Sequence, residues 1–232
     1  WGKGITGEGM VIAVLDTGLD LIYSTWGDSS APVTDVRRVH EAFTDNSFRT
    51  AAGKNNVRYT EEGMRQFLSR TKLTSNVNVA GELIIYQNND LYKNLKVPYA
   101  CDYADGDMNV QPVDEAHGTH VAGTVAGYAA NEEGVVTFSG VAPDAQILAM
   151  KVFPDEDAGA QEYAVINALE DAAILGADVM NLSLGSTNGY AVEDTAAYYS
   201  YQRLQESGIV FMVSAGNSAF SSMLNNRGDY NL

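Results

Sequence analysis

Residues 117–124 read HGTHVAGT, and the expected fold follows once this stretch is set beside Asp16. Small residues dominate positions 116–128, which predicts a helix that can approach neighbouring backbone closely and that carries His117 in its first turn. Asp16 follows the apolar run MVIAVL at positions 10–15, a pattern typical of a buried parallel strand. Because open α/β sheets bind ligands beyond the carboxyl ends of their strands, we expect Asp16 and His117 to share one site.

Strands and helices alternate along most of the chain. Apolar runs bounded by turn residues predict strands, and the segments between them show helical periodicity or a small-residue composition. This alternation indicates an α/β fold, a doubly wound parallel sheet in three layers with helices on both faces. The strands are expected at residues 10–15, 98–101, 146–152, 178–184 and 209–214, and the helices at residues 116–128, 161–175 and 192–207.

The composition is that of an ordered globular domain. Of 232 residues, 45% are apolar and 19% are charged. No apolar run reaches the roughly eighteen residues that a membrane span needs. The formal net charge of −16 argues against a nucleic-acid partner, which would require a basic surface. The single Cys101 cannot form an internal disulfide and is expected to be buried. Because the chain begins with Trp1 and shows no signal peptide, we expect it to be a piece of a longer precursor.

Charge is distributed unevenly along the chain. Residues 27–97 carry ten of the fourteen basic residues and eight of the thirty acidic ones, whereas the remainder carries four basic and twenty-two acidic residues. This contrast predicts an insertion at residues 27–97 with its own surface chemistry. Within the insertion we expect a strand at residues 82–87 and a helix at residues 60–70 whose inward side chains are Met64, Phe67 and Leu68.

Asp16 and His117 suit the acid–base chemistry that activates an alcohol nucleophile. A neutral imidazole takes the proton of the alcohol, and a buried carboxylate orients the ring and stabilises its charged form. The alternative is that Asp16 caps a helix and that His117 is a structural histidine. A metal pair of His117 and His120 fits poorly, because the zinc-protease pattern needs His at i and i+4 with Glu after the first, where Gly118 stands. We therefore expect no metal ligands, and we expect His120 to pack behind the site.

Two further strand ends carry polar groups. The sequence VSAGN at residues 213–217 ends an apolar strand with Asn217, whose amide can donate to a developing oxyanion. The alternative for Asn217 is a turn residue. The sequence NLSLG at residues 181–185 ends another strand in small residues, whose free backbone groups can pair with an extended peptide.

Together these motifs resemble those of the subtilisin-like serine proteases, the S8 family, whose triad runs Asp, His, Ser along the chain. The similarity extends over residues 1–26 and about 98–217. The resemblance implies that Asp16 is the orienting acid, His117 the general base and Asn217 the oxyanion donor. It also implies that a peptide or protein substrate is bound by Asp157, Ala158, Gly159, Ser183, Leu184, Gly185, Ala215 and Gly216.

Within this family the chain is most similar to the bacterial cell-envelope proteases of the lactocepin and C5a-peptidase group, which carry a long insertion between Asp and His. The resemblance implies a secreted or cell-surface serine endopeptidase that is made as a zymogen. The acidic residues 155–157 would border the bound peptide, and we expect them to favour basic substrate side chains. The alternative for these residues is a solvated loop.

The chief departure from the family is the missing nucleophile. No GTSMA-like segment occurs in the 232 residues. We therefore expect the chain to be the N-terminal part of a catalytic domain, inactive until a C-terminal segment of the same protein supplies the serine. The alternative is a non-catalytic protein-binding module that retains the cleft of a protease. Thr25 stands where the family has a calcium carboxylate, so no cofactor is expected, with calcium left open.

Overall fold

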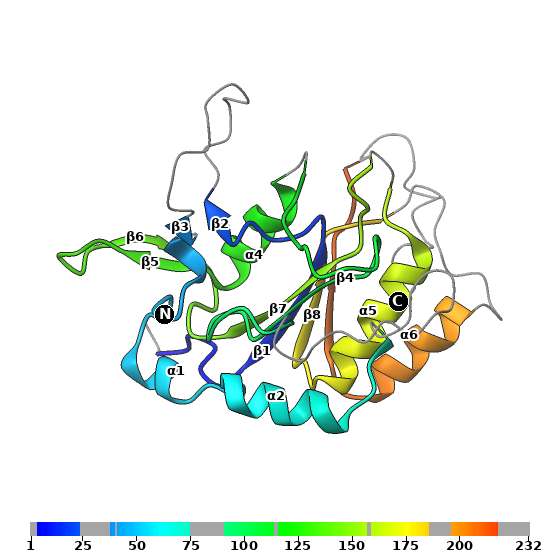
Figure 1. The fold of residues 1–232 in the computed structure, drawn as a ribbon, viewed down its shortest axis with the longest axis horizontal. Helices are drawn as coiled ribbons and strands as arrows, with labels where there is room; N and C mark the ends of the chain where they lie inside the picture. Colours follow the sequence, from blue (N-terminus) through cyan, green and yellow to red (C-terminus); the bar gives the residue numbers. More distant parts are fainter. Residues whose placement is uncertain are drawn as a thin grey trace.

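The centre of the molecule is a parallel sheet, seen in a computed structural model that describes residues 4–23, 38–39, 41–74, 91–113, 116–156, 159–185 and 196–217. Its five strands pair in the order β4-β7-β1-β8-β9 (Figure 1). They are β1 (Val11–Asp16), β4 (Tyr99–Asp102), β7 (Gln146–Lys151), β8 (Val179–Leu182) and β9 (Val210–Val213). All neighbouring pairs are parallel. The strands expected from the sequence are therefore present, with ends that differ by one or two residues.

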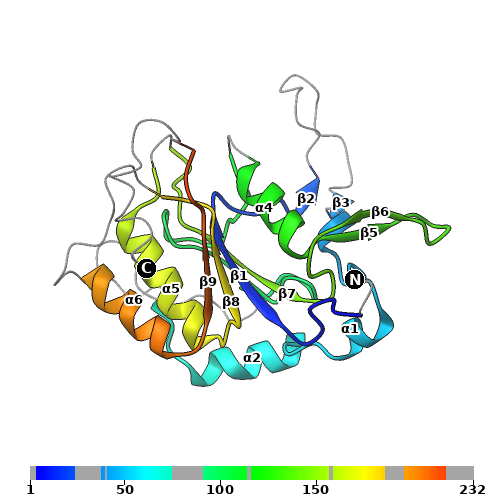
Figure 2. The same ribbon diagram turned by 180° about the vertical axis from the view of Figure 1, so that it is seen from behind.

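Successive residues of each strand face opposite sides of the sheet. In β1, Val11, Ala13 and Leu15 belong to one apolar cluster, while Ile12 and Val14 belong to another. Figure 2 shows helices on both sides of the sheet, with α4 on one side and α5 and α6 on the other. The first cluster takes in residues of α2 (Glu61–Arg70), α5 (Glu162–Ile174) and α6 (Ala196–Glu206), and the second takes in residues of α4 (His117–Ala126). The three-layer α/β architecture is confirmed.

The strand order changes direction at β1. The next two strands of the sheet along the chain, β4 and β7, lie on one side of β1, whereas β8 and β9 lie on the other. Segments that leave the carboxyl ends of such strands diverge, which makes room for a ligand at that edge. Asp16, the last residue of β1, stands at this point.

The structure also contains short elements that the sequence did not predict. They are β2 (Ile22–Tyr23) paired with β3 (Arg38–Val39), β5 (Tyr128–Ala130) paired with β6 (Val136–Ser139), the 3-10 helix η1 (Glu41–Phe43) and α1 (Ala51–Asn55). The helix expected at residues 116–128 ends earlier, at Ala126. Pairing with the second strand of the hairpin ends it, because the Gly127 carbonyl accepts from Gly140 N–H and Tyr128 pairs with Ser139.

Residues 41–74 of the expected insertion pack against the main sheet. The helix expected at residues 60–70 is α2, and its Met64 and Leu68 are buried in the same cluster as β1, with Phe67 beside them. Ahead of β7, the Asp144 carboxylate accepts from the backbone N–H and the hydroxyl of Thr50, both at 2.9 Å. The strand expected at residues 82–87 lies outside the described residues, and the boundaries of the insertion stay a prediction.

Two expectations from the composition can be compared with the structure. Cys101 is fully buried in β4, as expected. Within the described ranges, no helix has the length and apolar character needed to cross a membrane.

Lys96 is fully buried at the edge of the sheet opposite Asp16. Its ammonium donates to the carbonyl oxygens of Pro143 and Ala145, at 2.8 and 2.7 Å, and lies 4.6 Å from the centre of the Phe48 ring. Burial lowers the pKa of Lys96 to about 7, although the nearby Asp144 carboxylate acts to raise it. The charged form of Lys96 is thus costly in the folded state.

This burial predicts a rise of stability with pH. An unfolded chain holds the Lys96 proton up to its usual pKa of 10.5, whereas the folded chain releases it near pH 7. The unfolded state therefore binds more protons between these values, and the free energy of unfolding should rise by about 2 kcal/mol from pH 7 to pH 9. Denaturant unfolding of the wild type and of Lys96→Met measures this, and the difference should grow with pH in favour of the wild type. A constant difference would contradict the lowered pKa.

Candidate active site

A hydrogen bond joins Asp16 at the end of β1 to His117 at the start of α4. The Nδ1 atom of His117 lies 2.7 Å from Oδ1 of Asp16, although the two residues are 101 positions apart in the sequence. The Asp16 side chain is 1% exposed, whereas the His117 side chain is 48% exposed. The pair is therefore shielded from water at the carboxylate and open at the imidazole.

Helix α4 can reach β1 because residue 118 is a glycine. A Cβ atom on Gly118 would lie 2.2 Å from the Gly18 carbonyl oxygen and 3.1 Å from Cβ of Asp16. Gly18 has a φ of +119°, and a Cβ atom there would lie 2.4 Å from the Val110 carbonyl oxygen. A side chain at Gly118 would therefore push α4 away from the Asp16 turn, and a side chain at Gly18 would push that turn away from the segment at Val110.

Thr17, far from α4 in the sequence, provides a hydrogen-bond acceptor for a backbone amide in the first turn of α4. The residue before the helix, Ala116, makes no side-chain capping bond, and the Gly118 N–H instead donates to Oγ1 of Thr17 at 2.9 Å. In return, Oγ1 of Thr119 accepts from the Asp20 N–H at 2.8 Å. Amides in a first helical turn need such partners. These two bonds fix the first turn of α4, and with it the position of His117.

The environment of Asp16 determines which nitrogen of His117 carries the proton. Burial raises the pKa of Asp16, while the hydrogen bonds from His117 and from the Thr17 N–H oppose this rise. Its Oδ1 atom accepts from the Thr17 N–H at 2.7 Å, and its buried Oδ2 atom has no hydrogen-bond partner among the described residues. A carboxylate can only accept a hydrogen bond, so His117 donates its Nδ1–H to Asp16. In this tautomer the Nε2 atom carries no hydrogen and can accept a proton.

The same edge of the sheet holds residues expected to bind substrate. They follow β8 and β9 and are Ser183, Leu184, Gly185, Ala215 and Gly216, and the expected oxyanion donor Asn217 comes directly after them. The Ser214 hydroxyl donates to the Leu184 carbonyl oxygen at 3.3 Å, which ties the two strand ends together. Asn217 is exposed. The structure brings these residues to the edge that Asp16 occupies, and their roles stay predictions.

The segment after β7 contains the other residues expected to bind substrate. Gly159 is exposed, and its carbonyl oxygen accepts from the side-chain amide of Gln161 at 2.9 Å. Asp157 and Ala158 lie outside the described residues.

The subtilase family model matches residues 7–231. This chain belongs to the subtilase family. The family expected from the sequence motifs is thereby confirmed.

Several known proteins are similar to this subtilase. The PII-type proteinase of Lactococcus lactis subsp. cremoris is 32% identical over 219 residues, which is 93% of this chain and 10% of that protein. The minor extracellular protease Vpr of Bacillus subtilis (strain 168) is 41% identical over 141 residues, 57% of this chain and 16% of that protein. Among solved structures, MycP1 with its N-terminal propeptide removed has 20% identity and a TM-score of 0.49, covering 93% of this chain and 45% of that one. The chain spans about a tenth of the length of the lactococcal proteinase.

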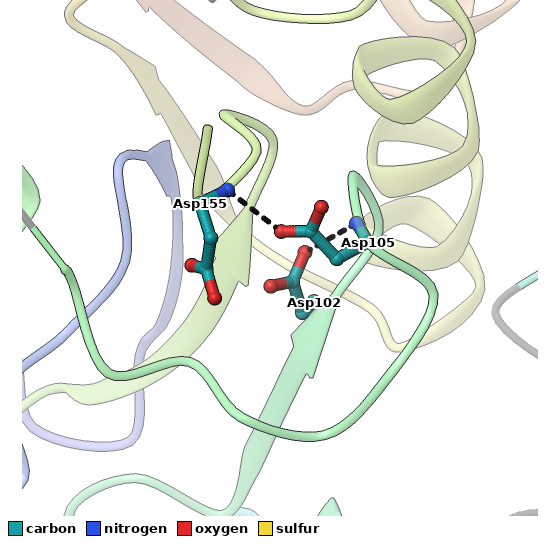
Figure 3. Close-up of side chains that lie close together, drawn as sticks. All are labelled: Asp102, Asp105 and Asp155. Atoms are coloured by element: carbon teal, nitrogen blue, oxygen red, sulfur yellow. Dashed lines mark hydrogen bonds between the residues drawn. The ribbon is translucent and has the colours of Figure 1, made fainter. Parts of the chain in front are cut away.

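The structure of the subtilase also shows a charged cluster around the buried Lys151, which was not predicted from the sequence. Lys151 at the end of β7 donates to carboxylate oxygens of Asp102, Asp105 and Asp155, at 2.5, 2.9 and 2.9 Å. Figure 3 shows the three carboxylates side by side, from β4, the turn after it and the loop after β7. Asp155 lies only four residues after Lys151, but this spacing indicates a contact only on a helix, and the other two contacts join distant segments.

This cluster bears on two expectations for the subtilase. Its three carboxylates have oxygen atoms within 4.8 Å of one another, a grouping that could hold a metal ion. The Lys151 ammonium is hydrogen-bonded to all three, so a cation is already present among them. Asp155 was expected to attract basic substrate side chains, but its charge is compensated by Lys151. Whether residues 155–157 favour basic substrates stays a prediction.

His120 differs from its expectation. It was expected to pack behind the site, but it is exposed. One turn along α4 from His117, its position faces solvent because the buried side of the helix is formed by small residues, Gly118, Ala122, Gly123 and Ala126. The prediction for His120 was wrong.

The close approach of α4 to β1 can be tested with Gly118→Ala. We expect this change to destabilise the subtilase by roughly 1–3 kcal/mol or more, because backbone atoms on both sides resist the added methyl group. Gly123→Ala in the same helix is the matched control, since its Cβ atom would first meet the Phe138 side chain, at 3.3 Å. Denaturant unfolding of the two variants gives the comparison, and equal losses would contradict the role assigned to Gly118.

Proposed function

We propose that this subtilase is part of a secreted or cell-surface serine endopeptidase in which Asp16 orients His117 and His117 acts as the general base. The observation that carries the proposal is the 2.7 Å hydrogen bond between the buried Asp16 carboxylate and Nδ1 of His117. A protein-binding module that merely retained the fold would have no need of this pair. The names of the relatives, a lactococcal proteinase and an extracellular protease, support the same activity and location.

The geometry suggests how the proton moves. With Nδ1 donating to Asp16, the Nε2 atom of His117 takes the proton of a serine hydroxyl as that oxygen attacks the peptide carbonyl carbon. The imidazolium that forms is stabilised by the Asp16 carboxylate, more strongly because the carboxylate is buried. His117 then gives the proton to the leaving amine. Asp16 accepts throughout and does not itself take the proton.

The remaining roles follow from the family. The Asn217 amide donates to the oxyanion of the tetrahedral intermediate. The backbone of Ser183–Gly185 and of residues 157–159 pairs with an extended peptide on either side, while Ala215 and Gly216 leave room for it. The substrate is a peptide or protein chain, and no metal or other cofactor takes part in this scheme, with a structural calcium ion left open.

The nucleophilic serine in this proposal comes from outside the 232 residues. Val210 and Met212 of β9 are 52% and 55% exposed, whereas Phe211 and Val213 of the same strand pack into the cluster of α5 and α6. The exposed pair therefore lies on the side of the sheet that carries α4. Apolar side chains of a parallel sheet are normally covered, which supports a further segment packing there, beside His117. We propose that this segment carries the serine and that the 232 residues alone are inactive.

The assignment of the base predicts the effect of His117→Ala in the complete protein. We expect kcat for a peptide substrate to fall by about four to six orders of magnitude, because triad members act as a unit. His120→Ala is the matched control, since His120 is exposed on the same helix, and it should leave kcat within about twofold. Steady-state kinetics with both variants measures this. Full activity without His117 would overturn the role of His117 as the base, whereas a complete wild type without hydrolysis would favour a non-catalytic binding module.

The oxyanion role predicts a smaller loss. Asn217→Ala in the complete protein should lower kcat by about 10²- to 10³-fold and leave KM nearly unchanged, because the amide donates to a charge that develops only in the transition state. A loss expressed mainly in KM would show that Asn217 binds the ground state instead. The isolated 232-residue chain should show no hydrolysis in the same assay until a folded serine-bearing segment is added.

A further inference from the structure

Lys151 lies between two carboxylates in the register of the sheet. It pairs with Asp16 of β1 on one side and with Asp102 of β4 on the other, and all three residues are about 1% exposed. Its backbone is held from both sides, since the Val152 N–H donates to the Asp16 carbonyl oxygen at 3.0 Å and the Tyr103 N–H donates to the Lys151 carbonyl oxygen at 2.8 Å. The starting point of the Lys151 side chain is therefore fixed relative to Asp16.

The Lys151 ammonium is directed away from Asp16 and toward the loops. Oδ2 of Asp102 and the carboxylates of Asp105 and Asp155 accept from it, while Oδ1 of Asp102 accepts from the N–H groups of Ala104 and Asp105. Burial alone would lower the pKa of Lys151, but the three carboxylates raise it, so the ammonium stays charged. Asp16 is thereby left to Thr17 and His117.

The same contacts hold the loop that follows β7. The loop is closed at its base by the Gln161 N–H, which donates to the Val152 carbonyl oxygen at 3.1 Å. On its first arm, Asp155 is bound twice, by its carboxylate to Lys151 and by its N–H to the Asp105 carboxylate at 2.8 Å. Gly159 lies on its second arm, with open space where a side chain would project. Lys151, whose neighbour in the sheet register is Asp16 of β1, is thus bound to the loop that carries Gly159.

The stem of Lys151 makes a further contact with the Asp16 turn. A Cβ atom on Gly18 would lie 3.2 Å from Cδ of Lys151, so the aliphatic stem packs under the turn formed by residues 16–18. One side chain therefore supports the turn that carries Asp16 and binds the loop after β7. This double contact is unlike that of an isolated surface ion pair, which joins two flexible side chains.

We propose that Lys151 is a positioning residue. It holds the loop after β7, and with it Gly159, in a fixed position relative to Asp16 and His117. The inference rests on the proposed peptidase function. Its consequence is that loss of the Lys151–Asp155 contact weakens the binding of peptides long enough to reach Gly159 and leaves the proton-transfer steps intact.

The test uses the complete protein with two substrates, a long peptide that extends several residues before the cleaved bond and a short one that carries a single residue there. Asp155→Asn keeps the shape of the side chain and removes its charge at a position that is 41% exposed, so the fold should tolerate it. We expect KM for the long substrate to rise about two- to fivefold, with kcat and the short substrate changed less than about twofold. Lys151→Met should act in the same direction and more strongly, and Lys151→Arg should restore part of the loss.

Two controls make the outcome decisive. Asp178→Asn removes a carboxylate that pairs with Arg58 at the opposite edge of the sheet, and it should leave both KM values unchanged. Labelling of the nucleophilic serine by a phosphonofluoridate reports the triad without an extended substrate. A wild type that neither hydrolyses peptides nor takes the label would overturn the proposed function. A wild type that does both, while Asp155→Asn and Lys151→Met leave the ratio of the two KM values unchanged, would overturn the role of Lys151 alone.

Discussion

The contact of the Gly118 backbone with the turn at residues 16–18 is the constraint on which the rest of the site depends. Helix axes normally keep their distance because side chains intervene, yet here the first turn of α4 meets the end of β1 with no Cβ atom between them. The helix must then find partners for its first amides in the strand turn itself, which is what the Thr17 hydroxyl provides. His117 is consequently held by the backbone on which it sits, and its ring needs only one bond, to Asp16, to complete its orientation.

At the carboxyl edge of the sheet, the charges around Lys151 keep its ammonium from pairing with Asp16. A buried carboxylate next in register to a lysine would ordinarily form an ion pair with it, and such a pair would compete with His117 for the carboxylate. Here, three other carboxylates bind the Lys151 ammonium. Asp16 thereby faces the His117 imidazole rather than a permanent cation, and its pKa is raised by burial instead of being lowered by an ammonium. The acidic cluster and the Asp16–His117 pair are in this sense parts of one arrangement.

The sequence could predict the sheet because its strands are mostly apolar and bounded by turn residues, and it could predict α2 because Met64, Phe67 and Leu68 recur at helical spacing. The contact of Asp16 with His117 could be expected from their places at a strand end and a helix start. The hairpin of β5 and β6 could not be predicted, since its strands are only three and four residues long and β6 is largely exposed. Nor could two of the partners of Lys151, because Asp102 and Asp105 become its neighbours only when β4 and β7 pair. Long-range register, which no local pattern records, accounts for the second omission.

The charge asymmetry of the sequence has a physical explanation in residues 41–96. Helix α5 begins near the carboxyl edge of the sheet and ends near the opposite edge, where its last carbonyl groups need donors. Arg58 and Tyr59 supply them, because a guanidinium nitrogen donates to the Gly176 carbonyl oxygen and the Tyr59 hydroxyl donates to that of Leu175. Lys96 does the same for two carbonyl groups ahead of β7. At the other end, where the amides of α5 begin, acidic residues gather around Lys151. Arg58 and Lys96 of the basic segment therefore lie at one edge of the sheet, and the acidic residues around Lys151 lie at the other.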